Sequence, residues 1–188
     1  MTPHHVPQTV SHFNAWPTWR RWRFLMALIE RNGLKAGAEL GLRKGGTSDF
    51  LLKHCPDLHM LGVDLWAPSG GYEDWTHEKH ERECRKTLAQ YGERAKIIKG
   101  LTTKVALEVP DRSLDFVFID ADHSEQGVRD DITAWLPKIK ETGFITGHDI
   151  NWPGVRAAVD DLVPGYLIGP DVVWFRPVNP PDGWQKDW

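Results

Sequence analysis

Acidic and imidazole side chains follow two apolar runs of the sequence that each read as a strand. Asp120 comes directly after the run 114–119, and His148 and Asp149 follow the run 143–147. In open α/β sheets the ligand lies outside the carboxyl ends of the strands, so these side chains are expected to share one cleft. Carboxylate oxygens suit Mg²⁺ or another divalent cation, and an imidazole also admits Mn²⁺ or Fe²⁺. We therefore predict a metal site at Asp120 and Asp149, with His148 as a third ligand.

His123 lies just beyond the first of these strand ends and is the candidate general base. An imidazole accepts a proton near neutral pH without strong perturbation, which a lysine does not. Any one of these acidic or imidazole groups, taken alone, is better explained as a helix cap or as a member of a local ion pair. The whole set, which includes Asp122 and Asn151, favours a functional site.

A glycine-containing turn separates a short apolar run from a helix-like segment. Glu39 is followed two residues later by Gly41, and Gly45 comes four residues after that. Glycine at a strand-to-helix turn lets the backbone approach a nucleotide-like ligand closely. The spacing Glu-x-Gly-x-x-x-Gly differs from the Gly-x-Gly-x-x-Gly of dinucleotide binders, which disfavours a nicotinamide dehydrogenase. Considered alone, the segment is better explained as a turn that binds nothing, since glycine-containing strand-to-helix turns occur in many α/β proteins.

Asp64 ends a second apolar run, which begins at Leu58. A carboxylate can accept hydrogen bonds from two adjacent hydroxyls at once, so an acid at this strand end is suited to a ribose diol. A helix-capping or solvated aspartate is the alternative interpretation.

The spacing of apolar runs and turn residues predicts one α/β domain with a parallel sheet and helices on both faces. Strands are expected at 36–41, 58–64, 95–98, 114–119, 143–147, 166–168 and 172–175. Helices are expected at 18–31, 46–54, 126–135 and 153–162, and Thr18 is expected to cap the first of them. A further charged helix is expected to follow the loop after the second strand and to end at about residue 91. The loop 66–75 has the glycines and tryptophans of a lid, although a plain surface loop explains it equally well.

We expect an N-terminal arm at 1–17, the domain at 18–176 and a C-terminal arm at 177–188. The C-terminal arm is expected to pack on its own domain or on a neighbouring subunit. The second arrangement would make the protein a homo-oligomer.

Composition limits the partners and the compartment. The chain has 188 residues, of which 40% are hydrophobic, and a net charge of -3, which gives no argument for nucleic acid or an anionic membrane. The arginines at 20, 21 and 23 are interpreted as a solvated helix face. The two cysteines lack metal-ligand spacing and fit a reducing compartment. Without a signal-peptide core or a membrane-length apolar run, we expect a soluble cytoplasmic protein.

The glycine turn, Asp64, the run from Asp115 to His123 and Gly147-His148-Asp149 together resemble a class I S-adenosylmethionine-dependent methyltransferase. The chain is most similar to the small single-domain group that includes the catechol-type and macrolide-sugar O-methyltransferases. The resemblance covers residues 34–176. It implies a Rossmann-like, doubly wound sheet of seven mostly parallel strands with an antiparallel closing strand.

The resemblance also implies roles for single residues. Gly41 and Gly45 would bring backbone close to the methionine part of the cofactor, and Glu39 would anchor their turn. Thr47 or Ser48 would bind the cofactor carboxylate. Asp64 would hold the ribose hydroxyls, and Gly100-Leu101-Thr102 would contact the adenine edge. Asp120 would bind a metal or contact the cofactor directly, and Asp149 would bind the metal. His123 would stand where catechol-type enzymes carry a lysine base.

The sequence therefore favours methyl transfer from S-adenosylmethionine to a hydroxyl of a small molecule, a sugar or a phenol, assisted by Mg²⁺ or another divalent cation. A second hypothesis is a metal-dependent hydroxylase-like relative on the same fold. A third is a cofactor-binding protein without turnover.

Overall fold

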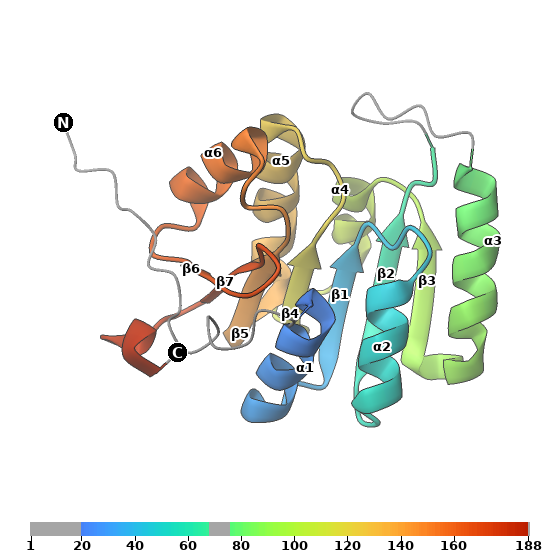
Figure 1. The fold of residues 1–188 in the computed structure, drawn as a ribbon, viewed down its shortest axis with the longest axis horizontal. Helices are drawn as coiled ribbons and strands as arrows, with labels where there is room; N and C mark the ends of the chain where they lie inside the picture. Colours follow the sequence, from blue (N-terminus) through green and yellow to red (C-terminus); the bar gives the residue numbers. More distant parts are fainter. Residues whose placement is uncertain (1–19, 68–75, 188) are drawn as a thin grey trace.

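The computed structural model describes residues 20–67 and 76–187. Seven strands form one sheet in the order β3-β2-β1-β4-β5-β7-β6. Their bounds are β1 Ala36–Leu40, β2 His59–Asp64, β3 Ala95–Lys99, β4 Leu114–Ile119, β5 Ile139–Gly147, β6 Leu167–Ile168 and β7 Trp174–Pro177. The first five strands pair in parallel, and β7 is antiparallel to both of its neighbours, β5 and β6. The predicted doubly wound sheet with an antiparallel closing strand is confirmed (Figure 1).

Helices cover both faces of this sheet (Figure 1). The α-helices are α1 Arg21–Asn32, α2 Gly46–His54, α3 His77–Leu88, α4 Thr102–Val105, α5 Glu125–Trp135 and α6 Pro153–Leu162. Short 3-10 helices follow at η2 Ala89–Arg94, η3 Ala106–Glu108, η4 Leu136–Lys138 and η5 Trp184–Asp187.

The central strand β4 shows why two cores form. Phe116 and Phe118 belong to the core shared with α1, α2 and α3, whereas Val117 and Ile119 belong to the core shared with α4, α5 and α6. All four side chains are buried. A strand that is buried on both faces needs a continuous apolar run, which is the pattern that the sequence shows here.

The register of the sheet aligns the strand ends that carry polar residues. Leu40 pairs with Val63 and with Ile119, and Ile119 pairs with Gly147. The residues one position further on are Gly41, Asp64, Asp120 and His148, so the parallel strands deliver all four to the same edge of the sheet.

Three of the differences between the element boundaries and the sequence prediction have a clear reason. Helix α1 begins at Arg21, and the predicted cap Thr18 lies outside the described residues. Strand β5 begins at Ile139, four residues early, because it pairs with β4 across a register shift after Leu114. The closing strand β7 begins only at Trp174, because the two residues before Val173 have positive φ angles, 55° at Asp171 and 52° at Val172.

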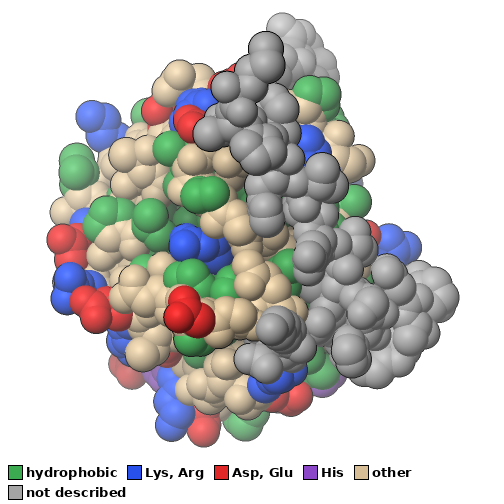
Figure 2. All heavy atoms as spheres, turned by 90° about the vertical axis from the view of Figure 1, so that its left-hand side faces the viewer, with side chains coloured by type: hydrophobic (Ala, Val, Ile, Leu, Met, Phe, Trp, Pro, Cys, Tyr) green, Lys and Arg blue, Asp and Glu red, His purple; other side chains and the backbone are tan. Residues whose placement is uncertain are grey.

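The last described residues of the chain pack on the domain beside β7. Trp184 is buried, and its ring stands edge-on to Phe175 with centroids 6.0 Å apart. On the coloured part of the face that Figure 2 shows, acidic and basic side chains are interspersed. No helix among residues 20–67 and 76–187 combines the length and the apolar composition that crossing a bilayer requires.

Candidate functional site

Glu39 ties the end of β1 to the start of α2. Its carboxylate accepts hydrogen bonds from the Ser48 N–H, at 3.0 Å, and from the Ser48 hydroxyl. Burial raises the pKa of Glu39 to about 7, and the two Ser48 bonds and the charge of Arg21 oppose that rise. The turn between β1 and α2 is therefore fixed by a buried acid that sits close to its titration point at neutral pH.

The two glycines of this turn are required by the packing of the protein itself. Gly41 has a φ of +90°, and a Cβ there would lie 2.1 Å from the backbone oxygen of Asp120. Gly45 has a φ of +78°, and its Cβ would lie 2.9 Å from the sulfur of Cys84. A Cβ on Gly46, by contrast, would meet nothing within 4 Å. The open space beside the turn therefore lies at Gly46.

Asp64 links the glycine turn to the chain that follows β2. One carboxylate oxygen accepts the N–H of Arg43 at 2.6 Å, and the other accepts the N–H of Trp66 at 2.7 Å. Each oxygen keeps a lone pair, so an oriented carboxylate remains able to accept hydroxyl protons. Of the predicted lid at 66–75, residues 68–75 lie outside the described residues.

The side chain of Thr102 is turned away from the sheet edge. Its hydroxyl donates to Asp131 on α5, and its carbonyl oxygen accepts the indole N–H of Trp135 at 3.2 Å. The neighbouring Leu101 is 52% exposed. Just after β3, the side chain exposed to a ligand is therefore the apolar Leu101, and the hydroxyl of Thr102 is already engaged by Asp131.

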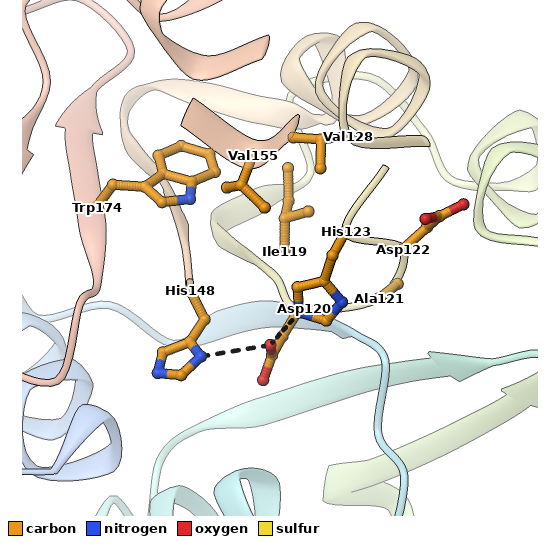
Figure 3. Close-up of a pocket in the computed structure, with 9 residues that line it drawn as sticks. All are labelled: Ile119, Asp120, Ala121, Asp122, His123, Val128, His148, Val155 and Trp174. Carbon is orange, nitrogen blue, oxygen red and sulfur yellow. Dashed lines mark ion pairs between the residues drawn. The ribbon is translucent and has the colours of Figure 1, made fainter. Parts of the chain in front are cut away.

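Four side chains meet where β4 and β5 end, and we refer to Asp120, His123, His148 and Asp149 as the acid–imidazole cluster. His123 Nε2 lies 2.8 Å from Asp149 Oδ2, and His148 Nδ1 lies 3.2 Å from Asp149 Oδ1. Asp120 Oδ1 lies 3.6 Å from His148 Nδ1 and 3.9 Å from His123 Nε2. Figure 3 shows the two imidazoles on either side of the Asp120 carboxylate.

The acid–imidazole cluster offers ligand atoms to a cation. One ligand atom each from Asp120, His123 and Asp149 lies within 4.8 Å of the other two. Sequence reasoning placed Asp120 and Asp149 in the metal set but assigned its third position to His148 and gave His123 another role. The structure places both imidazoles beside the two carboxylates, so either histidine is near enough to take part.

Burial sets the charge state of the cluster. It raises the pKa of Asp120 to about 8, with Arg21 opposing the rise and the carboxylates of Glu39, Asp149 and Asp171 adding to it. Burial also lowers the pKa of His148, whose Nε2 has no hydrogen-bond partner among the described residues. A cation bound here would favour the ionised form of Asp120, whereas the neutral imidazole of His148 is already in the form that binds metals.

Asp122 does not join the cluster. Its carboxylate accepts the backbone N–H of Ser124 at 2.8 Å and points away from Asp120 (Figure 3). Ser124 in turn caps α5 by accepting the N–H of Gly127.

A cavity of about 10 Å³, large enough for one water, lies beside the cluster. Its apolar lining consists of Ile119, Val128, Val155 and Trp174.

Two residues that sequence reasoning did not assign lie at this site. Trp152, at the start of α6, is 38% exposed, and its ring lies 4.9 Å from that of His123. Arg21, the first residue of α1, approaches Thr47 Oγ1 at 3.4 Å and Asp120 Oδ2 at 3.8 Å with its Nε. The position of Trp152, three residues after Asp149, was a usable signal. Nothing in the sequence distinguishes Arg21 from the arginines on either side of it.

The family described as methyltransferase domain matches residues 38–150, which is more than half of the 188-residue chain and includes the glycine turn and the acid–imidazole cluster. The chain belongs to this methyltransferase family. No curated protein matches it.

Solved structures share the fold of this methyltransferase domain at low sequence identity. An O-methyltransferase from Bacillus cereus in complex with SAH is 17% identical, with 85% of this chain and 82% of that chain covered and a TM-score of 0.61. SAH-bound PaMTH1 from Podospora anserina is 16% identical, with 86% of this chain and 80% of that chain covered and a TM-score of 0.63. TomG, an O-methyltransferase from Streptomyces achromogenes in complex with SAM, is 14% identical, with 82% of this chain and 78% of that chain covered and a TM-score of 0.61.

Proposed function

We propose that this methyltransferase domain transfers a methyl group from S-adenosylmethionine to a hydroxyl of a small molecule, a sugar or a phenol. The observation that carries the proposal is the contact between the two halves of the site. The backbone oxygen of Asp120 would lie only 2.1 Å from a Cβ at Gly41, so the acid–imidazole cluster and the glycine turn adjoin. A methyl donor and a proton acceptor are thereby brought to one edge of the sheet.

The residues along this edge fit the cofactor that we propose. The open space at Gly46 leaves room beside the turn. Asp64 is held by two backbone N–H groups with lone pairs free for the ribose hydroxyls. Leu101, exposed at the end of β3, offers an apolar surface for the adenine. The three solved structures compared above are described as bound to SAH or SAM, which supports the same cofactor here.

His123 is proposed to remove the proton of the acceptor hydroxyl. When bound, the cofactor supplies a methyl group that is already electrophilic, so alignment and proton removal are what remain for the protein. Donation from His123 Nε2 to Asp149 fixes the tautomer that leaves Nδ1 free to accept a proton. The Asp149 carboxylate also stabilises the imidazolium that forms. Trp152 beside His123 offers a ring face against which a planar acceptor or a sugar can lie.

A divalent cation is proposed at Asp120 and Asp149, with one of the two imidazoles as a further ligand. Ligand atoms of Asp120, His123 and Asp149 lie within 4.8 Å of one another, and His148 Nδ1 faces both carboxylates at 3.6 and 3.2 Å, so the donor set fits such an ion. Bound there, it would acidify an acceptor hydroxyl.

The test is the formation of S-adenosylhomocysteine from S-adenosylmethionine, measured by mass spectrometry, with panels of phenols and sugars as acceptors. His123→Asn should lower the turnover of the acceptor found by about 10²–10⁴-fold and leave cofactor affinity unchanged. His59→Asn, at an exposed histidine that begins β2, is the matched control. Full activity after exhaustive chelation would remove the cation from the proposal. A fall of less than about threefold in His123→Asn would move the base to His148.

A second candidate function is oxidation at a metal held by the acid–imidazole cluster. Two carboxylates and two histidines at one site include the imidazole and carboxylate ligands that iron oxygenases use. Oxygen consumption by the Fe²⁺-loaded protein, without formation of S-adenosylhomocysteine, would select this function over methyl transfer.

A further inference from the structure

Resting on the proposed function, we propose that Arg21 binds the carboxylate of the cofactor's amino-acid end and thereby distinguishes S-adenosylmethionine from adenosyl compounds that lack this group. Arg21 lies on α1, before the 38–150 region that matches the family. The proposal gives a role to the one side chain of the site that neither the sequence motifs nor the proton transfer uses.

The two hydroxyls expected to bind this carboxylate are already engaged in the protein. Ser48 is fully buried, and its hydroxyl donates to Glu39. Thr47 is 4% exposed, and its hydroxyl oxygen accepts the Arg21 Nε–H at 3.4 Å. A ligand that approaches the start of α2 therefore meets the guanidinium that covers Thr47 before it meets either hydroxyl.

Arg21 has unused donors. Its side chain is 30% exposed, and Nε makes both the Thr47 hydrogen bond and the 3.8 Å approach to Asp120. Among the described residues neither Nη atom has a hydrogen-bond partner. A guanidinium with free Nη donors matches a carboxylate, which it can bind through two parallel N–H···O bonds.

A contact across the fold holds Arg21 at this edge of the sheet. The backbone N–H of Arg21 donates to Asp171 Oδ2 at 3.1 Å, in the turn between β6 and β7. Asp171 is followed by Val172, and both have left-handed φ angles, 55° and 52°. A β-branched residue such as Val172 adopts this conformation only where the surroundings impose it. The start of α1 is therefore docked on the site, and Arg21 does not lie on the solvated face that the sequence predicted.

The charges around Arg21 favour an anionic group on the ligand. Glu39, Asp120, Asp149 and Asp171 surround the site with carboxyl groups, and Arg21 is the cation whose charge acts on both Glu39 and Asp120. A ligand carboxylate would be repelled by whichever of these groups are ionised, so the guanidinium is the part of the site that attracts it. The amino-acid end of the cofactor carries one carboxylate, and the guanidinium of Arg21 lies where it can bind that group.

The experiment measures binding by calorimetry with two ligands that differ only in this carboxylate: S-adenosylhomocysteine and its decarboxylated form, S-adenosyl-3-thiopropylamine. Arg21→Met should raise the Kd for S-adenosylhomocysteine by about 10–100-fold and change the Kd for the decarboxylated ligand by less than about twofold. Arg21→Lys should fall between wild type and Arg21→Met, because it keeps the charge but loses the planar pair of donors. Arg23→Met, two residues further along α1 and exposed, is the matched control and should match wild type.

Equal weakening of both ligands would overturn the inference, since Arg21 would then act only as a counter-ion of Asp120 or as a support of the fold. Unchanged binding of S-adenosylhomocysteine in Arg21→Met would overturn it as well. If the wild-type protein binds neither ligand, the proposed function fails together with this inference. If wild type binds S-adenosylhomocysteine but the Arg21 variants show no selective loss of affinity for it, the inference about Arg21 fails and the proposed function stands.

Discussion

Asp64 is a residue on which cofactor affinity is expected to depend. Replacing it by alanine removes the acceptor that we propose for the ribose hydroxyls, so Asp64→Ala should weaken the binding of S-adenosylhomocysteine by about 1–3 kcal/mol. Calorimetry measures the change. Asp57→Ala, at an exposed aspartate in the turn before β2, is the control and should bind like wild type.

Because Asp64 also accepts two backbone N–H groups, the thermal stability of the ligand-free variant must be measured alongside its affinity. A variant that keeps its fold and its affinity would contradict the ribose assignment.

Glu39 should make stability depend on pH. Folding raises its pKa from 4.5 to about 7 through burial, so between these values the folded state binds more protons than the unfolded state. Its contribution is fully present below about 4.5 and is lost as the pH rises through about 7. The shift corresponds to a loss on the order of 3 kcal/mol.

The measurement is urea unfolding of wild type and Glu39→Gln at pH values from 5 to 8. The glutamine can still accept the Ser48 hydrogen bonds but does not titrate, so the stability of Glu39→Gln should fall less steeply with pH. Any constant cost of the buried amide shifts its whole curve and leaves the slope informative. Parallel curves for the two proteins would refute the assignment.

At the scale of elements, the junction of β1 and β4 depends on Gly41. A Cβ there would lie 2.1 Å from a backbone oxygen of Asp120, and backbone cannot rotate aside as a side chain can. Gly41→Ala should therefore destabilise the protein by at least about 2 kcal/mol, measured by urea unfolding.

The control is Gly33→Ala at the end of α1, where φ is +61° but a Cβ would meet nothing within 4 Å. It carries only the cost of the left-handed conformation, about 1 kcal/mol. Equal destabilisation of the two variants would show that the contact with Asp120 does not constrain the junction.

At the scale of the whole molecule, the C-terminal segment is part of the domain core. Trp184 is 5% exposed and packs against the core that α1 and β7 share. Trp184→Ala should lower the free energy of unfolding by about 3 kcal/mol, whereas Trp152→Ala, at a tryptophan that is 38% exposed, should cost less than about 1 kcal/mol. Denaturant titrations of the two variants compare them directly. A smaller loss in Trp184→Ala than in Trp152→Ala would mean that the segment after β7 contributes little to the core.

The sequence by itself determined the sheet and the edge at which chemistry is expected. Apolar runs place the strands locally, and parallel strands bring their carboxyl ends together whatever the surrounding loops do. For this reason Asp64, Asp120 and His148 could be assigned to one edge before their distances were known. The match to the methyltransferase family rests on the same stretch, residues 38–150.

Only the tertiary structure decided how the side chains at that edge pair. It turned Asp122 and Thr102 toward α5, joined His123 to Asp149, and showed that Gly41 is required by Asp120. Arg21 reaches the site because its N–H bonds a residue 150 positions away. A contact of that range depends on how separate elements dock, and docking is fixed by the packing of the whole core rather than by any local pattern of residues.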